Sequence, residues 1–413
     1  MHVLISAVGS AGDVHPFIAI GQALRRRGHE VDLLASAYFA ERVSRAGLGF
    51  VAVGTLEDYQ RGVANAEMWH PRRGFAAIWS EIQRQVLPSY ELIAERVERA
   101  RTILVGSTLA VGSRLAQEKL GLRGVTIHLS PSCIFSAAAP PRWPTLPRWS
   151  TRVPAGLTRP FQRWVERHFL DGVIAEEFNC TRTQLGLPPV QRIMSHWLNS
   201  PDLVLCAWPD WFAPAQEDWP PNTHTTGFPQ WNQPTEKALS PELTAFLNTG
   251  SPPIAFTPGS SMAHGKAFFA RAIAASQKNG QRALLVTPFA DQIPARFPAG
   301  VLHQTYVPFD HLMPRVSALV HHGGIGTSAT AMANAVPQLI TPFAHDQFDN
   351  AMRIERLGVG RELRVGASIH DWSRALSELT SSADIRSSCL RYQQLLAAQG
   401  NAAEIIADHI ESS

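Results

Sequence analysis

The chain reads His321-His322-Gly323-Gly324-Ile325-Gly326-Thr327-Ser328 directly after a short apolar run, Ser317 to Val320. Small residues then continue to Ala335, so the order predicts a buried strand, a glycine-rich turn and a helix from Thr327 to Ala335. Glycines before a helix allow backbone N–H groups to approach an anion, which the positive end of the helix dipole also attracts. The stretch therefore predicts a phosphate-binding turn, to which His321 can add a hydrogen bond.

A second polar stretch follows the next expected strand, Pro337 to Ile340. It holds Asp346 and Gln347, a carboxylate and an amide that can bind the hydroxyl groups of a sugar. The carboxyl ends of neighbouring parallel strands meet at one edge of a sheet, so both stretches should contribute to one site. A glycine turn alone is common in α/β proteins, and this one has neither Walker nor Rossmann spacing. The two stretches together predict a site for a nucleoside-diphosphate sugar.

Composition excludes several classes of protein. The 413 residues suffice for two domains of roughly 200 residues each, and the net charge of +3 is too small to indicate a nucleic-acid partner. The four cysteines have no short pair spacing, which argues against a disulfide framework or a zinc site and fits a reducing compartment. There is no basic leader segment, and no apolar run approaches the roughly 20 residues of a membrane helix. We therefore expect a cytoplasmic protein, and contact with a membrane surface stays open.

Short apolar runs alternate with helical patterns along most of the chain, which predicts an α/β protein with doubly wound parallel sheets. The expected Rossmann-like domains are residues 1–216 and residues 241–381. Residues 217–240, within a region rich in proline and tryptophan, are expected to link them. We expect the two domains to face each other across a cleft that holds the ligand.

The turn after the first strand, Gly9-Ser10-Ala11-Gly12-Asp13, lacks the G-x-G-x-x-G pattern, so a nicotinamide or flavin cofactor is not indicated. Its glycines leave room for a ligand against the backbone. Asp13 begins a helix and has two interpretations: a helix cap, or the base that accepts a proton from an attacking hydroxyl. His15, inside the first helical turn, competes for the role of base.

Sugar transfer with inversion would combine these features. A carboxylate beside the acceptor hydroxyl takes its proton while the hydroxyl oxygen bonds to the anomeric carbon. The turn from Gly324 to Thr327, the helix end and His321 would hold the leaving diphosphate. The sequence contains no Asp-x-Asp pair for a divalent ion, so a metal is not expected.

These stretches resemble the GT-B glycosyltransferases, a group that includes plant natural-product, bacterial macrolide and glycopeptide, and sterol transferases. Residues Gly9 to Phe17 are similar to sterol glucosyltransferases and to the rhamnosyltransferases of rhamnolipid synthesis, which we take as the nearest likeness. Residues His321 to Thr327 and His345 to Asn350 resemble the signature of the plant enzymes. The resemblance implies a GT-B fold in which the first domain binds the acceptor and the second the donor. It also implies that a helix over residues 382–413 packs back on the first domain.

Carried over position by position, the resemblance makes Asp13 the catalytic base and His321 a ligand of the diphosphate. Asp346 and Gln347 would bind the sugar hydroxyls. Tyr306 falls near the position of an aromatic ring that stacks on the nucleotide base, and it can equally be a half-buried loop residue. The implied donor-binding residues are Gly12, Gly259, Ser260, Tyr306, Val307, His321, Gly324, Gly326, Thr327, Asp346 and Gln347.

Aromatic residues in the first half have two interpretations as well. Trp69, Phe75, Trp79 and Phe135 can line an apolar acceptor pocket, although helical spacing of aromatic residues is more typical of a core. The segment from Phe161 to Phe178 is either a lid or a packed amphipathic helix.

The sequence thus predicts an inverting, metal-independent glycosyltransferase with no cofactor, which uses a nucleoside-diphosphate sugar as co-substrate. By resemblance, the preferred donor is dTDP-rhamnose and the preferred acceptor is a hydroxy-fatty-acid lipid. One alternative is a UDP-glucose-dependent enzyme that acts on a sterol, carotenoid or polyketide. The others are a GT-B epimerase and a non-catalytic protein that binds the nucleotide sugar in a biosynthetic complex.

Overall fold

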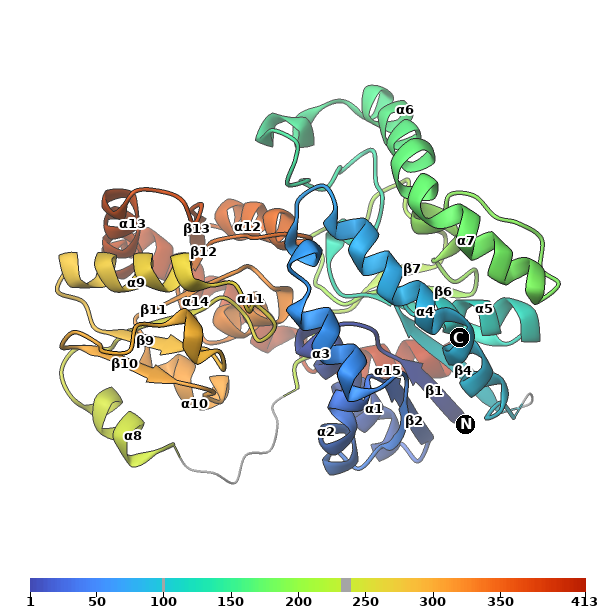
Figure 1. The fold of residues 1–413 in the computed structure, drawn as a ribbon, viewed down its shortest axis with the longest axis horizontal. Helices are drawn as coiled ribbons and strands as arrows, with labels where there is room; N and C mark the ends of the chain where they lie inside the picture. Colours follow the sequence, from blue (N-terminus) through green and yellow to red (C-terminus); the bar gives the residue numbers. More distant parts are fainter. Residues whose placement is uncertain (99–100, 232–238) are drawn as a thin grey trace. The chain divides into compact units, whose positions relative to one another are not determined.

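The structure is a computed structural model that describes residues 1–98, 101–231 and 239–413 (Figure 1). The chain forms two compact units, one made of Met1–Trp231 with Asn401–Ser413 and the other of Asn232–Gly400. Each unit contains a single sheet in which the paired strands are parallel. The prediction of two doubly wound parallel sheets is confirmed. Residues 232–238 of the expected linker lie outside the described residues.

The sheet of the first unit has seven strands in the order β3-β2-β1-β4-β5-β6-β7. Strand β1 has its five residues buried, as expected for a central strand covered on both faces. The chain passes from β1 to β2 on one side and later to β4 on the other, so the carboxyl end of β1 lies where the strand order reverses. The strands are β1 (His2–Ser6), β2 (Glu30–Ala35), β3 (Gly49–Ala52), β4 (Thr102–Ser107), β5 (Arg123–His128), β6 (Leu203–Cys206) and β7 (Thr223–Thr225).

Helices flank this sheet, and the longest of them is α4. Three further short helical segments matter for the site or the surface: η2 (Ala66–Trp69), η3 (Pro131–Cys133) and the π-helical turn η5 (Glu166–Leu170) that joins α6 to α7. The α-helices of the first unit are α1 (Ala11–Arg26), α2 (Ala40–Arg45), α3 (Leu56–Ala64), α4 (Gly74–Ala94), α5 (Val111–Leu120), α6 (Ala155–Val165), α7 (Asp171–Gln184) and α15 (Ala402–Ser412).

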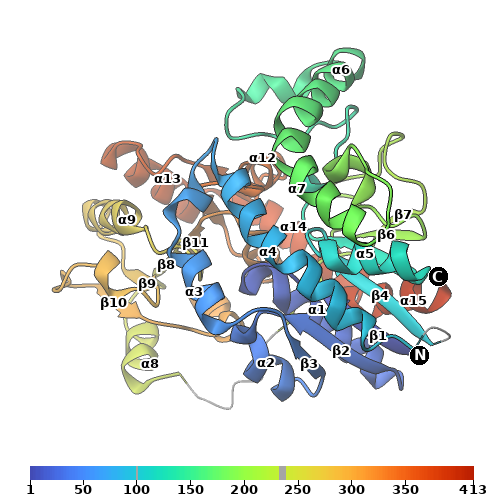
Figure 2. The same ribbon diagram turned by 45° about the vertical axis from the view of Figure 1, so that its right-hand side comes forward.

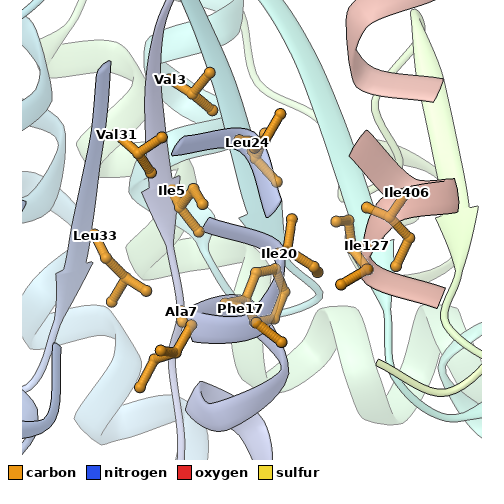
Figure 3. Close-up of a cluster of buried hydrophobic side chains, with 14 of the residues drawn as sticks. Val3, Ile5, Ala7, Phe17, Ile20, Leu24, Val31, Leu33, Ile127 and Ile406 are labelled. Carbon is orange, nitrogen blue, oxygen red and sulfur yellow. The ribbon is translucent and has the colours of Figure 1, made fainter. Parts of the chain in front are cut away.

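The core of the first unit lies between the sheet and two helices from opposite ends of the chain (Figure 3). Phe17, Ile20 and Leu24 on α1 pack with the β1 side chains, and Ile406 on α15 joins the same cluster. Residues 17, 20 and 24 repeat at the three- and four-residue spacing of one helical face. Since α15 fills this face of α1, the last helix is a structural part of the first unit.

The second unit has a six-stranded sheet in the order β10-β9-β8-β11-β12-β13. Its strand order reverses between β8 and β11, so the loops after these two strands lie beside each other at the carboxyl edge. The strands are β8 (Ile254–Thr257), β9 (Ala283–Val286), β10 (Val301–Gln304), β11 (Ala318–His321), β12 (Gln338–Ile340) and β13 (Gly360–Glu362). The helices are α8 (Pro241–Asn248), α9 (Lys266–Lys278), α10 (Phe309–Leu312), α11 (Ile325–Ala333), α12 (Gln347–Arg356), α13 (Ile369–Ser381) and α14 (Ala383–Gln399).

Two expected boundaries need correction. The first unit does not end at residue 216, because β7 lies inside the expected linker and pairs with β6 as the seventh strand. The expected helix over residues 382–413 is in fact two helices, since Gly400 has φ 82° and the Asn401 side chain caps α15. Helix α14 packs against α11 in the second unit, and only α15 packs on α1.

None of the helices in the described part of the chain is both long and apolar enough to cross a bilayer.

Candidate active site

The turn between β1 and α1 holds Asp13 at the third position of the helix, and Ser10 is the N-cap. One carboxylate oxygen, Oδ2, accepts hydrogen bonds from the Ser10 backbone N–H at 2.7 Å and from the Ser10 hydroxyl at 2.9 Å. This is the carboxylate half of a capping box, which satisfies an otherwise free N–H at the helix start. Asp13 is therefore part of a helix cap, and it also stands at the carboxyl end of the central strand.

Gly9 makes this approach of the carboxylate possible. It has φ 132°, a conformation that L side chains rarely adopt, and a Cβ built on it would lie 2.3 Å from Asp13 Oδ2. The next residue back, Val8, donates its backbone N–H to the Ser107 hydroxyl at the end of β4. The turn is thus fixed to the two central strands, and Asp13 is held in one orientation.

The second carboxylate oxygen of Asp13, Oδ1, has no hydrogen-bond partner among the described residues. Burial raises the pKa of Asp13 above its ordinary value, against the two hydrogen bonds from Ser10, which lower it. A carboxylate with a raised pKa is a stronger proton acceptor than one in water. The geometry therefore leaves one oxygen of Asp13 available for a ligand's hydroxyl.

His15 lies two residues further along the helix and is packed among aromatic rings. Its ring centroid is 4.8 Å from that of Trp231 and 6.5 Å from that of Phe39. Burial and the nearby Arg42 lower the pKa of His15 to about 4, so the imidazole is neutral at physiological pH. Its Nε2 is buried with no hydrogen-bond partner in the described residues.

In the second unit, His321 ends β11 and is fully buried. Its Nδ1 accepts the Gly323 backbone N–H at 3.2 Å, so the proton resides on Nε2, which lies 3.0 Å from the Gln338 side-chain oxygen. Burial lowers the pKa of His321 to about 3. Both ring nitrogens are used inside the protein, which corrects the expectation that His321 is a direct diphosphate ligand. This histidine instead stabilises the shape of the turn.

The adjacent residue, His322, has a different environment. A Cβ on Gly259 would lie 2.8 Å from the His322 ring, and a Cβ on Gly324 would lie 2.5 Å from its Nε2. The ring therefore stands between the loop after β8 and the start of α11. Neither ring nitrogen forms a hydrogen bond with a described residue, and Nδ1 is buried. The sequence pattern did not single out His322, because it does not tell which of two adjacent histidines turns back into the protein.

Helix α11 begins immediately after this turn, with Gly324 as its N-cap. Its first backbone N–H groups have no acceptor inside the helix, which makes the helix start a place for an anion. Apart from its chain neighbours and the backbone of its own helix, no atom of the described residues lies within 4 Å of the position that a Cβ on Gly326 would take, so an anion can approach the backbone there. Thr327 is half-buried at the same helix start. The glycine-rich turn thus has the shape expected of a phosphate-binding turn.

Asp346 and Gln347 lie at the start of α12, where Asp346 is the N-cap. The Gln347 side-chain oxygen accepts the backbone N–H groups of Phe343 and Ala344 at 2.7 and 3.1 Å. Its amide nitrogen makes no hydrogen bond with a described residue, so the group left for a sugar hydroxyl is a donor. Asn350 donates to Asp346 Oδ2 at 2.8 Å and to the Gly323 carbonyl at 2.9 Å, and so ties this pair to the glycine-rich turn.

The other expected donor-binding residues are placed as follows. Gly259 follows β8 with φ 102°, and Ser260 next to it is exposed. Tyr306 is 61% exposed on the loop after β10, whereas the Val307 side chain is in the core and leaves only its backbone for a ligand. Gly12 is exposed in the first turn of α1 and therefore belongs to the first unit.

The four aromatic residues expected at the acceptor side do not share one environment. Trp79 is 2% exposed in the core cluster beneath α4, and its ring contacts that of Phe178, so it is a core residue and the acceptor assignment is wrong for it. Phe75 is partly buried against the same cluster. Trp69 on η2 and Phe135 after η3 are half-buried on the connections that follow β3 and β5. Only these last two lie on loops that can present a ring to a ligand.

Within the ranges 1–98, 101–231 and 239–413, no three His, Cys, Asp or Glu side chains are grouped as a metal site would require.

Two family models match the chain, each over one of the two regions described above. The glycosyltransferase family 28 N-terminal domain matches residues 3–138, which contain the Asp13 turn. The C-terminal domain of the erythromycin biosynthesis protein CIII-like family matches residues 288–412, which contain the His321 turn and α12.

Comparison with known proteins extends the match to nearly the whole chain. O-mycaminosyltylonolide 6-deoxyallosyltransferase of Streptomyces fradiae is 30% identical over 381 residues, which cover 87% of this chain and 84% of that protein. Vancomycin aglycone glucosyltransferase of Amycolatopsis orientalis is 30% identical over 384 residues, with 87% and 85% covered. The crystal structure of the glycotransferase of kitacinnamycin has the same fold, with a TM-score of 0.77, 18% identity and coverage of 100% and 98%. The chain therefore belongs to the GT-B glycosyltransferases of the family 1 and family 28 type, enzymes that transfer a hexosyl group from a nucleoside-diphosphate sugar.

Proposed function

We propose that the chain transfers a 6-deoxyhexosyl group, rhamnosyl by preference, from a dTDP-sugar to a hydroxyl of a hydrophobic acceptor, with inversion at the anomeric carbon and with Asp13 as the base. The observation that carries the proposal is Oδ1 of Asp13, which no described residue engages and which the capping box holds at the carboxyl end of β1. A fixed carboxylate with one available oxygen and a raised pKa is suited to take a proton from a hydroxyl group.

The reaction balances as a single displacement. The acceptor oxygen forms the new bond to the anomeric carbon, the bond from that carbon to the diphosphate oxygen breaks, and Asp13 Oδ1 takes the hydroxyl proton. The bonding electrons leave with the diphosphate, which gains negative charge. In the second unit, the N–H groups at the start of α11 and a ring nitrogen of His322 would stabilise that charge. These donors belong to the protein itself, so we expect transfer to continue in the presence of a chelator.

A 6-deoxy sugar is supported by the relative that transfers a 6-deoxyallosyl group, and a dTDP donor by the relative named dTDP-epi-vancosaminyltransferase. Asp346 would accept from one sugar hydroxyl and the Gln347 amide would donate to another. The Gln347 side-chain oxygen already accepts hydrogen bonds from the loop at residues 343–344. Replacing Gln347 would therefore change the loop conformation and weaken the binding of the sugar. Tyr306, exposed on the loop after β10, is the proposed ring for the nucleotide base.

A hydrophobic acceptor is supported by the half-buried rings of Trp69 and Phe135 on the loops of the first unit. Phe135 also lies 5.8 Å, between ring centroids, from Trp143. We propose a hydroxy-fatty-acid lipid as the acceptor, since a flexible aliphatic chain can pack on separate aromatic side chains.

The test is a matrix of donors and acceptors with product analysis by mass spectrometry. The donors are dTDP-rhamnose and UDP-glucose, and the acceptors are a 3-hydroxy fatty acid ester, a sterol and a polyketide aglycone, each with and without a chelator. We expect a rhamnosylated lipid from dTDP-rhamnose under both conditions. Turnover of UDP-glucose alone would overturn the donor assignment, and complete dependence on added metal would overturn the mechanism.

Two alternative functions are each supported by a specific observation. Glucosylation of a polyketide or glycopeptide-like acceptor is supported by the relative that glucosylates the vancomycin aglycone. A non-catalytic nucleotide-sugar-binding role is supported by the cap function of Asp13, which gives the carboxylate a structural purpose independent of chemistry. Donor binding without turnover of any donor in the matrix would favour that second alternative.

A further inference from the structure

Helix α6 carries a row of apolar side chains that the protein leaves exposed. Leu157 is 67% exposed, Trp164 50% and Phe169, on the following turn η5, 57%. Phe161 joins them, and the ring centroids of Phe161 and Phe169 lie 6.4 and 5.4 Å from that of Trp164. In both views α6 stands away from the sheet of its own unit (Figures 1 and 2). We call these four side chains, with the arginines described below, the α6 surface.

The outward orientation of this row is fixed by polar contacts on the other side of the helix. The Gln162 side chain donates to the Ser136 carbonyl at 2.9 Å, and Thr158, which is buried, donates to the Val153 carbonyl at 3.1 Å. Glu166, also buried, accepts the Ser195 backbone N–H at 3.0 Å. Rotating α6 to bury the aromatic row would break these hydrogen bonds, and each buried polar group left unpaired costs about 1–3 kcal/mol. The exposed row is therefore a stable feature of the fold.

The stretch of chain that carries the row, residues 148–173, has exposed charges of a single sign. Between residues 148 and 173 the acidic residues are Glu166 and Asp171, and both are buried and hydrogen-bonded to the segment at residues 192–195. The exposed charges in that stretch are all arginines. Four of them form no ion pair with any described residue: Arg152, Arg159, Arg163 and Arg167.

Helical geometry separates the two groups of side chains. At 100° a residue, Leu157, Phe161 and Trp164 lie on one side of α6, whereas Arg159 and Arg163 lie on the remaining exposed side, away from that row. Tryptophan, phenylalanine and leucine on one side, with arginines on the polar side, is the pattern of a helix that lies in a membrane interface. The apolar side chains enter the boundary of the acyl chains, and the guanidinium groups meet anionic headgroups.

We propose that the α6 surface docks the protein on an anionic phospholipid membrane, with α6 parallel to the bilayer plane. The four arginines without an ion-pair partner among the described residues select this partner, because an apolar row alone would fit a second copy of the chain as well. The inference concerns only the first unit and does not depend on which sugar is transferred. Docking there would bring the first unit to the place where hydrophobic hydroxyl compounds partition.

The test is flotation of the full-length protein with vesicles of phosphatidylcholine alone or with roughly one third phosphatidylglycerol, at low and high salt. We expect the protein to float with the anionic vesicles only, and less at high salt. The variant Phe161→Ser/Trp164→Ser/Phe169→Ser should no longer float. Arg159→Gln/Arg163→Gln/Arg167→Gln should partition roughly a hundredfold less at low salt, since each arginine near an anionic surface contributes about 1 kcal/mol.

A matched control removes the same number of exposed arginines from the second unit, Arg315→Gln/Arg386→Gln/Arg391→Gln, and should float like the wild type. Thermal stabilisation by dTDP, measured on the same preparations, shows that each variant is folded and keeps failure of docking separate from failure of donor binding. Flotation of the control and the arginine variant to the same extent would overturn the inference. A second result would also overturn it: the wild type does not float but sediments as a dimer, and the aromatic variant sediments as a monomer. The apolar row would then join two copies of the protein.

Discussion

The turn after β1 and the turn after β11 are built alike, yet they expose different parts to a ligand. Both join a central parallel strand to a helix at the reversal of strand order, and both depend on a glycine with positive φ, Gly9 in one and Gly323 in the other. In the first turn the conspicuous side chain, Asp13, uses one oxygen for the cap and keeps the other available. In the second, His321 uses both ring nitrogens internally, and His322 with the helix start remains available.

What a polar residue in a motif can offer a ligand therefore depends on which of its individual atoms already form internal hydrogen bonds. A carboxylate has two oxygens and can hold a turn and meet a ligand at once, whereas a buried imidazole with both nitrogens paired can only hold the turn. The first turn is thus suited to proton transfer, and the second to binding an anion.

The largest effect is expected from Asp13→Asn. Asparagine retains an oxygen for the Ser10 N–H, so the cap remains, but it cannot accept the acceptor's proton at neutral pH. We expect the rate of transfer to fall by roughly two orders of magnitude or more, measured as kcat with the donor and acceptor that the wild type uses. Ser10→Ala is the control, since it removes a hydrogen bond to the carboxylate and leaves the carboxylate itself. A Ser10→Ala loss as large as that of Asp13→Asn would mean that the cap, and not the base, is what matters.

The next effect concerns stability. His321→Leu leaves the Gly323 N–H and the Gln338 side-chain oxygen unpaired in a buried place, so the free energy of unfolding should fall by about 1–3 kcal/mol. Urea unfolding measures it. His322→Leu is the matched control, and it should change the free energy of unfolding less because no internal hydrogen bond is lost. Equal losses for the two variants would remove the distinction between the two histidines.

Donor binding should depend more on His322 than on His321. His322→Ala removes a hydrogen-bond donor to a charged diphosphate, and we expect the Kd for dTDP to rise roughly tenfold to a hundredfold. Calorimetric titration measures this change. If His322→Ala bound dTDP like the wild type, the helix start alone would hold the diphosphate.

Acid should weaken the fold through the buried histidines. Burial lowers the pKa of His321 to about 3 and that of His322 to about 4, below the ordinary value of 6.5. The unfolded chain therefore binds protons first as the pH falls below about 6.5, so the free energy of unfolding should decrease with falling pH down to the folded pKa values. Unfolding midpoints from pH 7 to pH 4 test this, and His321→Leu should show a shallower decrease. A midpoint that rises on acidification would contradict it.

The smallest effects are expected at the two glycines at the start of α11. Gly326→Ala meets no atom within 4 Å and should stabilise the fold by at most about 1 kcal/mol, because alanine favours a helix. It should nevertheless weaken dTDP binding several-fold if the diphosphate approaches that backbone. Gly324→Ala must displace the His322 ring, 2.5 Å from the new Cβ, and should weaken dTDP binding more. Thermal unfolding with and without dTDP separates the two changes, and equal dTDP binding by both variants and the wild type would place the diphosphate elsewhere.

Much of the fold could be predicted because the central strands are continuous apolar runs between turn residues. The boundaries were harder: α1 begins at Ala11 and continues through Pro16, although the proline nitrogen cannot donate a helical hydrogen bond. Strand β7 was missed because three residues, Thr223–Thr225, give too short a pattern among prolines.

In the candidate site, composition and spacing predicted the two turns and singled out the Asp346-Gln347 pair. They could not tell which histidine nitrogen or which carboxylate oxygen is used internally, since that depends on partners such as Gln338 and Ser10. Trp79 shows the same limit on the acceptor side, because its spacing on α4 fits a core face as well as a pocket, and the structure places it in the core.

The division of labour between the two turns is tested most directly by titrating dTDP into the wild type, Asp13→Asn and His322→Ala. We predict that Asp13→Asn binds dTDP with the affinity of the wild type, because its turn takes no part in holding the diphosphate, and that His322→Ala binds it roughly tenfold or more weakly. Loss of dTDP binding in Asp13→Asn, with unchanged binding in His322→Ala, would contradict the account.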